Sequence, residues 1–89
     1  MFVTFLRFSE NRTGAPDFMP AHNDWIAQGF ADGGAAAGGA ILHHGESRDA
    51  YDARIAADPF VVQRVVTAET YEIDPKRTAP VLDVLKSAA

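Results

Sequence analysis

The sequence contains no cysteine, and this absence excludes two kinds of bond. The chain has no disulfides and no thiolate ligands for a metal ion, which fits the reducing cytoplasm. Basic residues are also few, because eight Lys and Arg stand against twelve Asp and Glu, for a formal net charge of −4. No cluster of basic side chains is dense enough to follow a phosphate backbone, so we expect no nucleic-acid partner.

Long apolar runs are missing as well. No run approaches the roughly 20 residues that a membrane-spanning helix needs, and the first residues do not form a charged leader with an apolar core. The glycine-rich residues 33–39 lack the Lys-Ser/Thr of a P-loop and do not match a dinucleotide-binding GxGxxG motif. We therefore expect a turn there, no cofactor, no membrane partner and a cytoplasmic location.

What the sequence does contain is enough apolar material for one folded domain. Hydrophobic residues make up 47% of its 89 residues, which is ordinary for a globular protein. A chain of this length buries only about two thirds of the surface that its unfolded form exposes, so association would add stability. We expect a single domain over residues 1–89, with a C-terminal extension from about residue 75.

The order of apolar and turn-forming segments predicts an α+β fold. The expected elements are a strand at 2–8, a helix at about 17–30, a strand at 39–44, a helix after Ser47, a short helix from 59 to about 64 and a strand at 65–73. A shortened second strand is expected near residues 35–37. This order is typical of a ferredoxin-like antiparallel sheet with its helices on one face.

The first strand, residues 2–8, is apolar on both of its faces. Phe2 and Leu6 point to one side, and Val3 and Phe5 point to the other. A sheet with one solvated face should alternate apolar and polar residues more cleanly. We therefore expect two chains to pack their open sheet faces together, as a homodimer or within a higher homo-oligomer. A monomer with an apolar face is the alternative, and the apolar residues after Pro80 should dock on the domain or on a second copy.

His22 and Asp58 are the candidate catalytic residues. Asp58 precedes a proline, which disfavours helix at Asp58 and suits Pro59 to begin a new helix that Asp58 caps. His22 is expected near the start of a helix capped by Asp17, where the dipole favours a neutral ring. A neutral imidazole held by a carboxylate is a competent general base. In the alternative, His22 only packs against the core while Asp58 is only a cap.

The segments Pro20-Ala21-His22 and Ala57-Asp58-Pro59-Phe60, with the strand at 65–73, resemble the YCII-related (YciI-like) family. This resemblance implies a dimeric α+β barrel, as in muconolactone isomerases, and it implies an active-site pair at His22 and Asp58. Dehydrochlorination of a hydroxylated aromatic ring is known in that family. One departure is that only residues 33–39 separate the first helix from the Gly-Ala-Ile-Leu strand, so the hairpin is shorter than the family's pattern.

Two further residues are candidate substrate-binding groups. Phe60 belongs to the break at Asp58, and Arg7 on the first strand would need a carboxylate if it were buried, either a substrate's or that of Glu69. His43 and His44 do not predict a metal site, because neighbouring residues on a strand point to opposite faces.

Two functions follow from these residues. The first is a cofactor-free acid–base enzyme of the lyase or isomerase type. Its substrate would be a small oxygenated molecule, with aromatic molecules among the candidates. The second is a non-catalytic dimeric module that binds a metabolite or regulates an enzyme. An open pocket beside a close pair of His22 and Asp58 would favour the first function.

Overall fold

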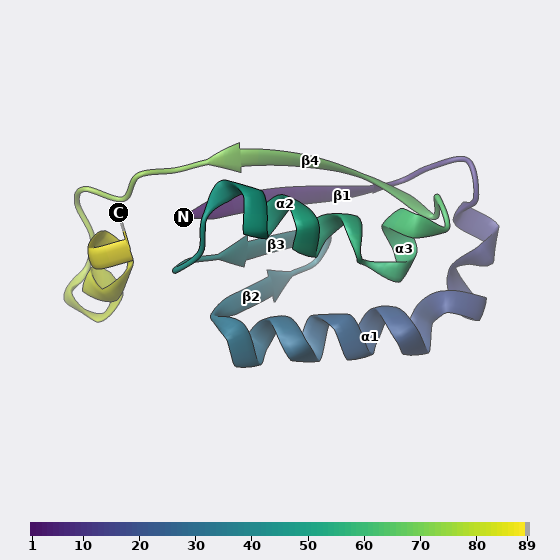
Figure 1. Cartoon of the computed structure of the whole chain (residues 1–89), viewed down its shortest axis with the longest axis horizontal. Coiled ribbons are helices and arrows are strands. Elements are labelled where there is room, and N and C mark those ends of the chain that lie inside the picture. Colours follow the sequence, from purple (N-terminus) through teal and green to yellow (C-terminus); the bar gives the residue numbers. More distant parts are fainter. Residues whose placement is uncertain (89) are drawn as a thin grey trace.

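Four strands form one antiparallel sheet in the order β2-β3-β1-β4 (Figure 1). This computed structural model describes residues 1–88, without the side chains of residues 37, 87 and 88. The strands are β1 (Phe2–Phe8), β2 (Gly34–Ala37), β3 (Ala40–His43) and β4 (Val66–Glu72). The helices are α1 (Ala15–Asp32), α2 (Arg48–Ala56) and α3 (Pro59–Val62), with 3-10 segments η1 (Arg12–Gly14) and η2 (Pro80–Ala88).

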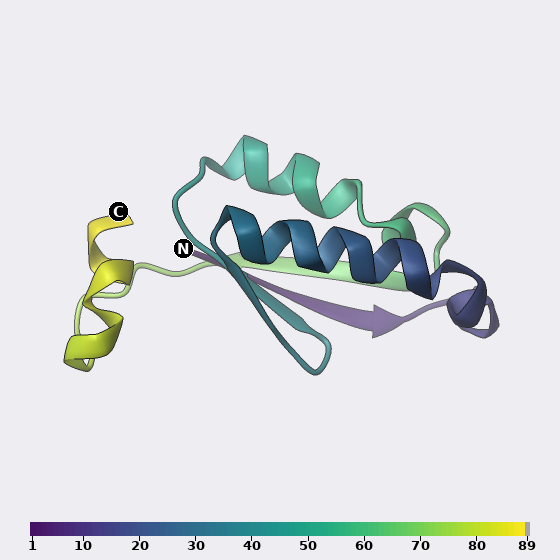
Figure 2. The same cartoon turned by 90° about the horizontal axis from the view of Figure 1, so that it is seen from below.

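The helices α1 and α2 lie on one side of the sheet (Figure 2). Together with the strand order, this confirms the expected α+β, ferredoxin-like architecture. The strand β1 lies in the interior of the sheet, paired antiparallel with β3 on one side and with β4 on the other. Its pairing with β4 runs over seven residues, from Phe2 with Glu72 to Phe8 with Val66.

The core under α2 is built around Tyr51, which is fully buried. Its ring stacks on Phe2 at a centroid distance of 4.8 Å, and its hydroxyl lies 2.6 Å from Thr4 Oγ1. Thr4 Oγ1 in turn lies 2.7 Å from the hydroxyl of Thr70, so β1, β4 and α2 are joined through one chain of hydroxyl groups. Burial raises the pKa of Tyr51 above its ordinary value, since a phenolate there would lose its hydration.

The predicted short second strand is present as the four residues of β2. It reaches β3 through a two-residue turn at Gly38 and Gly39, whose φ angles are +42° and +95°. Positive φ at both central residues is the backbone that tight antiparallel hairpins favour, and glycine adopts it without steric cost. The Gly39 carbonyl also accepts a hydrogen bond of 2.8 Å from the Leu6 amide, which ties the turn to β1.

The first helix begins earlier and ends later than the sequence predicted. Gly14 takes the N-cap position without a side-chain hydrogen bond, so the expected cap at Asp17 is wrong, and Asp17 lies in the first turn instead. The helix tolerates Pro20 inside it, beyond the first turn. Gly33 ends it in the left-handed conformation with φ of +111°, as the glycines at 33 and 34 predicted.

The second helix and the break that follows it agree closely with the sequence. Ser47 caps α2, because its hydroxyl accepts a hydrogen bond of 3.1 Å from the Ala50 amide. Asp58 caps α3 in the same way, accepting from the Phe60 amide at 3.0 Å. A capping side chain usually contributes about 1 kcal/mol, so the short α3 depends strongly on Asp58.

The face of the sheet away from the helices is open and carries exposed aromatic side chains. Phe5 and Tyr71 meet edge to face on it at 6.1 Å, and they are 41% and 49% exposed. Tyr71 is therefore not part of the core, and neither is Phe30, which is exposed on α1. No helix among residues 1–88 is long and apolar enough to cross a bilayer.

The segment η2 lies beyond one end of the sheet, apart from the helices (Figures 1 and 2). It starts at Pro80 as predicted, but with 3-10 geometry. Leu82 and Leu85 line a hollow beside Met1 and Leu42, while Val81 is 84% exposed. Docking on the domain thus involves only part of the apolar segment.

Candidate active site

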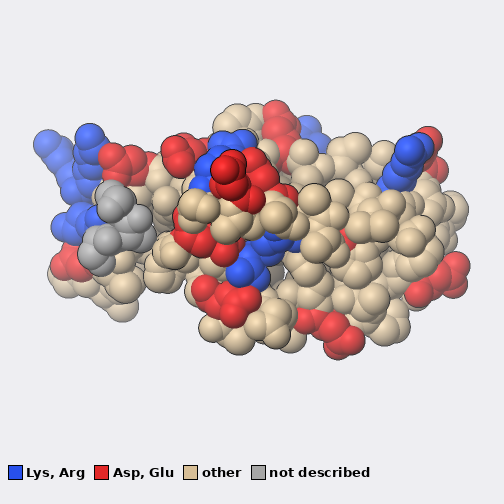
Figure 3. All heavy atoms as spheres, in the orientation of Figure 1, with Lys and Arg blue, Asp and Glu red and all other residues tan. Residues whose placement is uncertain are grey.

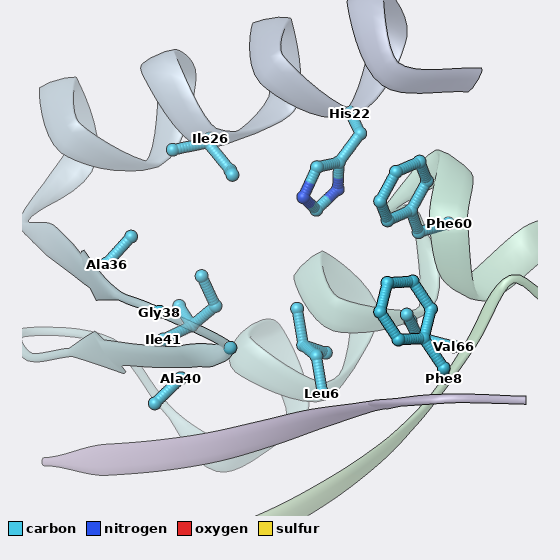
Figure 4. A pocket seen from close by; sticks show the side chains of 11 residues that line it. Leu6, Phe8, His22, Ile26, Ala36, Gly38, Ala40, Ile41, Phe60 and Val66 are labelled. Atoms are coloured by element: carbon cyan, nitrogen blue, oxygen red, sulfur yellow. The ribbon is translucent and has the colours of Figure 1, made fainter. Parts of the chain in front are cut away.

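A cavity of about 440 Å³ lies between α1 and the sheet. Figure 4 shows side chains from α1, α3 and the strands converging on it. Its lining is formed by Leu6, Phe8, His22, Ile26, Ala36, Gly38, Gly39, Ala40, Ile41, Phe60 and Val66. Of these lining residues His22 alone has an ionisable side chain, so one imidazole supplies the chemistry in an otherwise apolar space.

His22 and Asp58 form the pair that the sequence predicted. His22 Nδ1 lies 2.7 Å from Asp58 Oδ1, although the two residues are 36 positions apart in the chain. Asp58 is fully buried and His22 is 7% exposed, so water does not weaken the interaction. The geometry brings the two side chains together, and their catalytic role stays a prediction.

The contacts of Asp58 fix which nitrogen of His22 faces the cavity. Asp58 Oδ1 also accepts a hydrogen bond of 3.0 Å from the backbone amide of Phe60, which can only donate. The same oxygen therefore acts as an acceptor toward His22, and Nδ1 carries the hydrogen. In the neutral ring Nε2 then has a free lone pair, and Figure 4 shows the imidazole directed from α1 into the cavity.

Aromatic rings hold the His22 side chain from its sides. The Phe60 ring is stacked on it, with centroids 3.9 Å apart and an interplanar angle of 3°. Trp25 lies one turn along α1, at 6.0 Å and 20°, and its indole N–H donates to the Arg54 carbonyl at 3.0 Å. The imidazole thus has one well-defined orientation.

The structure corrects the reason proposed for a neutral His22. Because α1 begins at Ala15, His22 lies two turns inside the helix. The influence of a helix dipole falls off within the first turn. The helix N-terminus therefore has little influence on His22, and the contact with Asp58 sets the tautomer of the ring.

Of the two candidate substrate-binding residues, the structure brings only Phe60 to the pair. Arg7 lies on the open face of the sheet, with its side chain 73% exposed, and its Nη2 is 4.0 Å from Glu69 Oε2. The predicted partner is correct, but both groups face away from the cavity. Surface ion pairs of this kind contribute about 0–1 kcal/mol.

The surface around the cavity carries few charges. Figure 3 shows acidic and basic side chains intermixed over α2 and a largely uncharged area over α3 and the adjoining part of α1. Arg54 on α2 is held by Glu46 and Asp32 at 2.8 Å each.

His43 is buried beneath α2 and is separate from the cavity. Its side chain is 1% exposed, and neither ring nitrogen has a hydrogen-bond partner among the described residues. Glu46 Oε1 lies 3.6 Å from Nδ1 but is bonded to Arg54. Burial lowers the pKa of His43, and the Glu46 carboxylate opposes this shift. Within residues 1–88, no three His, Asp or Glu side chains gather to hold a metal ion.

Replacing His43 with leucine is expected to stabilise the protein increasingly as the pH falls. Because the folded state lowers the pKa of His43 below its ordinary value of about 6.5, unfolding takes up a proton below that pH, and the folded state loses stability there. The gain of His43→Leu over wild type should grow by at most about 1.4 kcal/mol per pH unit below 6.5. Urea unfolding at pH 7.5, 6.5 and 5.5 measures it, with His44→Gln as control. A gain that is independent of pH would contradict the prediction.

Sequence reasoning missed most of the cavity wall. No lining role was assigned to Ile26, Phe8, Gly38 or Ile41. The signal that was available is the spacing of His22 and Ile26, which lie four residues apart and therefore on one helix face. The stacking of Phe60 on His22 depends on the angle between α1 and α3, for which the sequence carries no local signal.

Comparisons of the chain with protein-family models, with curated proteins and with solved structures find no match.

Proposed function

We propose that this protein is a small-molecule enzyme that uses His22 and Asp58 for cofactor-free acid–base chemistry of the lyase or isomerase type. The observation that carries this proposal is the 2.7 Å contact between His22 Nδ1 and Asp58 Oδ1 at the wall of a 440 Å³ cavity. A volume of 300–1,000 Å³ with few polar groups is typical of small-molecule sites. We also propose that the chain is related to the YCII-related proteins, as the segments around His22 and Asp58 suggest.

The chemistry follows from the orientation of the imidazole. His22 Nε2 takes a proton from a hydroxyl group or an acidic C–H of the substrate, and it returns that proton to another atom of the same molecule or to a leaving group. Asp58 keeps the hydrogen on Nδ1 and stabilises the imidazolium while the proton is held. A buried carboxylate that is already in place needs no reorganisation for this task.

The cavity lining indicates the kind of substrate. Leu6, Ile26 and Ile41 offer apolar contacts, and the lining residues include no Lys or Arg to pair with an anion. A small oxygenated molecule with an apolar body fits this lining, and hydroxylated aromatic rings are one such class. Binding an apolar ring here would remove about 25 cal/mol of unfavourable hydration for each Å² buried.

The test uses proton exchange, because it needs no knowledge of the final product. The protein is incubated in D₂O with a panel of small phenols, enolisable ketones and lactones, and deuterium incorporation is followed by NMR. We expect exchange with at least one compound, slowed about a hundredfold or more in His22→Gln and Asp58→Asn. His44→Gln is the matched control, since it makes the same replacement outside the cavity lining, and it should exchange at the wild-type rate.

Two outcomes contradict the proposal. One is exchange that proceeds equally fast in wild type and His22→Gln. The other is a compound that binds in the cavity, shifts the His22 resonances and shows no exchange. This second result would favour the alternative, a non-catalytic module that binds a metabolite or regulates a neighbouring enzyme.

We further propose that two chains pair through the open sheet face, as a cytoplasmic homodimer. Phe5 and Tyr71 are each more than 40% exposed there. Burying side chains of this size contributes about 1.5–3 kcal/mol each, before the cost of association. In such a dimer Arg7 and Glu69 would be covered together.

Replacing Phe5 with glutamate is expected to convert this dimer to a monomer, because it would place a charge in the apolar contact. Sedimentation or light scattering at about 50 μM should give twice the chain mass of 9.6 kDa for wild type and one chain mass for Phe5→Glu. Phe30→Glu is the matched control, because Phe30 is also exposed but lies on α1, in the helical layer. A wild-type protein of one chain mass would refute the pairing.

A further inference from the structure

Phe60 contacts both members of the proposed catalytic pair. Its ring lies flat on the imidazole of His22, at 3.9 Å and 3°. Its backbone amide donates a hydrogen bond of 3.0 Å to Asp58 Oδ1, the oxygen that also holds His22. One residue therefore touches the imidazole on its face and the carboxylate at its bound oxygen.

The Phe60 ring presents its face to the ring of His22. An offset parallel stack is favourable between two neutral rings as well. A cationic ring is attracted in addition to the negative face of a benzene ring, and this attraction grows when water is absent. Both residues are buried, with His22 7% and Phe60 6% exposed, so the contact is largely dry.

Few other charged or aromatic groups lie near the His22 ring. Asp58 is the charged side chain in contact with His22, and it acts on the Nδ1 edge of the ring. Trp25 is farther away, at 6.0 Å, and its indole N–H donates to the backbone carbonyl of Arg54. The remaining lining residues of the cavity are apolar or glycine.

We propose that Phe60 is a positioning residue whose ring stabilises positive charge on His22. The effect of this stabilisation on turnover rests on the proposed function. When the substrate's C–H or O–H bond breaks and the proton forms an N–H bond at Nε2, the imidazole becomes cationic. Asp58 then stabilises that charge from the ring edge and Phe60 from the ring face, until the proton returns to the product.

The experiment measures the pH at which His22 is half protonated, by NMR titration of its Cε1–H resonance without substrate. Phe60→Leu keeps an apolar side chain but removes the π face, and we expect the half-protonation pH to fall by about one unit. Phe60→Tyr keeps the ring and should stay within roughly 0.3 units of wild type. Phe60→Met serves as a second ring-free variant if Phe60→Leu does not fold.

The matched control is Phe8→Leu, which removes the same atoms from another aromatic residue of the cavity wall. It should leave the titration within about 0.3 units of wild type, because no Phe8 ring lies on His22 among the described ring contacts. The direction of the change separates two causes. Loss of the ring attraction lowers the half-protonation pH, whereas extra water admitted by a smaller side chain raises it.

An unchanged or raised half-protonation pH in both Phe60→Leu and Phe60→Met would overturn the proposal, and so would an equal fall in Phe8→Leu. Because the titration contains no substrate, it is independent of the exchange assay. If the half-protonation pH falls as expected but no compound of the panel exchanges, the role of Phe60 stands and the enzyme proposal is weakened. If exchange depends on His22 but the half-protonation pH does not fall in the Phe60 variants, the enzyme proposal stands and the role of Phe60 is refuted.

Discussion

Replacing Asp58 with alanine is expected to lower the free energy of unfolding by about 2–4 kcal/mol. The substitution removes the cap of α3, worth about 1 kcal/mol, and it removes a hydrogen bond to a charged group, worth about 1.5–3 kcal/mol. The loss of Asp58 Oδ2, which is buried without a partner among the described residues, offsets part of this cost. Chemical unfolding at pH 7.5 measures the change.

Two further variants separate the contribution of the α3 cap from that of the contact with His22. Asp58→Ser keeps a short capping oxygen for the Phe60 amide but does not reach His22, so it should recover about 1 kcal/mol. Asp58→Asn keeps an oxygen for both donors and should lose less than half as much stability as Asp58→Ala. If the asparagine and alanine variants are equally destabilised, the charge of Asp58 and not its geometry supports the fold, and this prediction is wrong.

Replacing Tyr51 with alanine should have the largest effect on stability, about 3–5 kcal/mol, as for other large buried aromatic residues. The ring is fully buried and stacked on Phe2, and its removal leaves a cavity between α2 and the sheet. A domain of this size has a total stability of roughly 5–15 kcal/mol, so much of the variant could be unfolded at 37 °C. Thermal and urea unfolding followed by circular dichroism measure the loss.

Tyr51→Phe is the matched control, because it keeps the stacked ring and removes only the hydroxyl. Thr4 retains its contact with Thr70, so no buried hydroxyl is left without a partner. The expected cost is therefore about 1 kcal/mol. A cost near that of the alanine variant would show that the hydroxyl chain through Thr4, and not ring packing, holds α2 on the sheet.

The sequence predicted the order of the elements because each carries a local signal. The run of aromatic and branched residues marks β1, the cap at Ser47 marks α2, and the proline after Asp58 marks the start of α3. The start of α1 was placed two residues late because Asp17 resembles a cap, whereas the helix begins from Gly14 without a side-chain bond. Boundaries of this kind depend on backbone geometry that residue types specify only weakly.

The pairing of His22 with Asp58 was predicted from residue types and a family resemblance. The structure adds the distance and the bound oxygen. Sequence alone did not predict the stacked Phe60, or the buried His43 whose ring nitrogens have no hydrogen-bond partner among the described residues. Both features depend on how the helices pack on the sheet. The sequence also did not decide on which face of the sheet Arg7 lies, since a strand with apolar residues on both sides gives no indication of which side the helices cover.

The position of β1 between β3 and β4 has a consequence for how the chain folds. Its seven paired residues meet a strand whose residues lie 58 to 70 positions later in the chain. Loops that long must close before the contacts they bring can stabilise anything, so folding should take milliseconds or longer rather than microseconds. Until residue 66 leaves the ribosome, β1 has an unpaired apolar edge, and a nascent chain at that stage is open to aggregation.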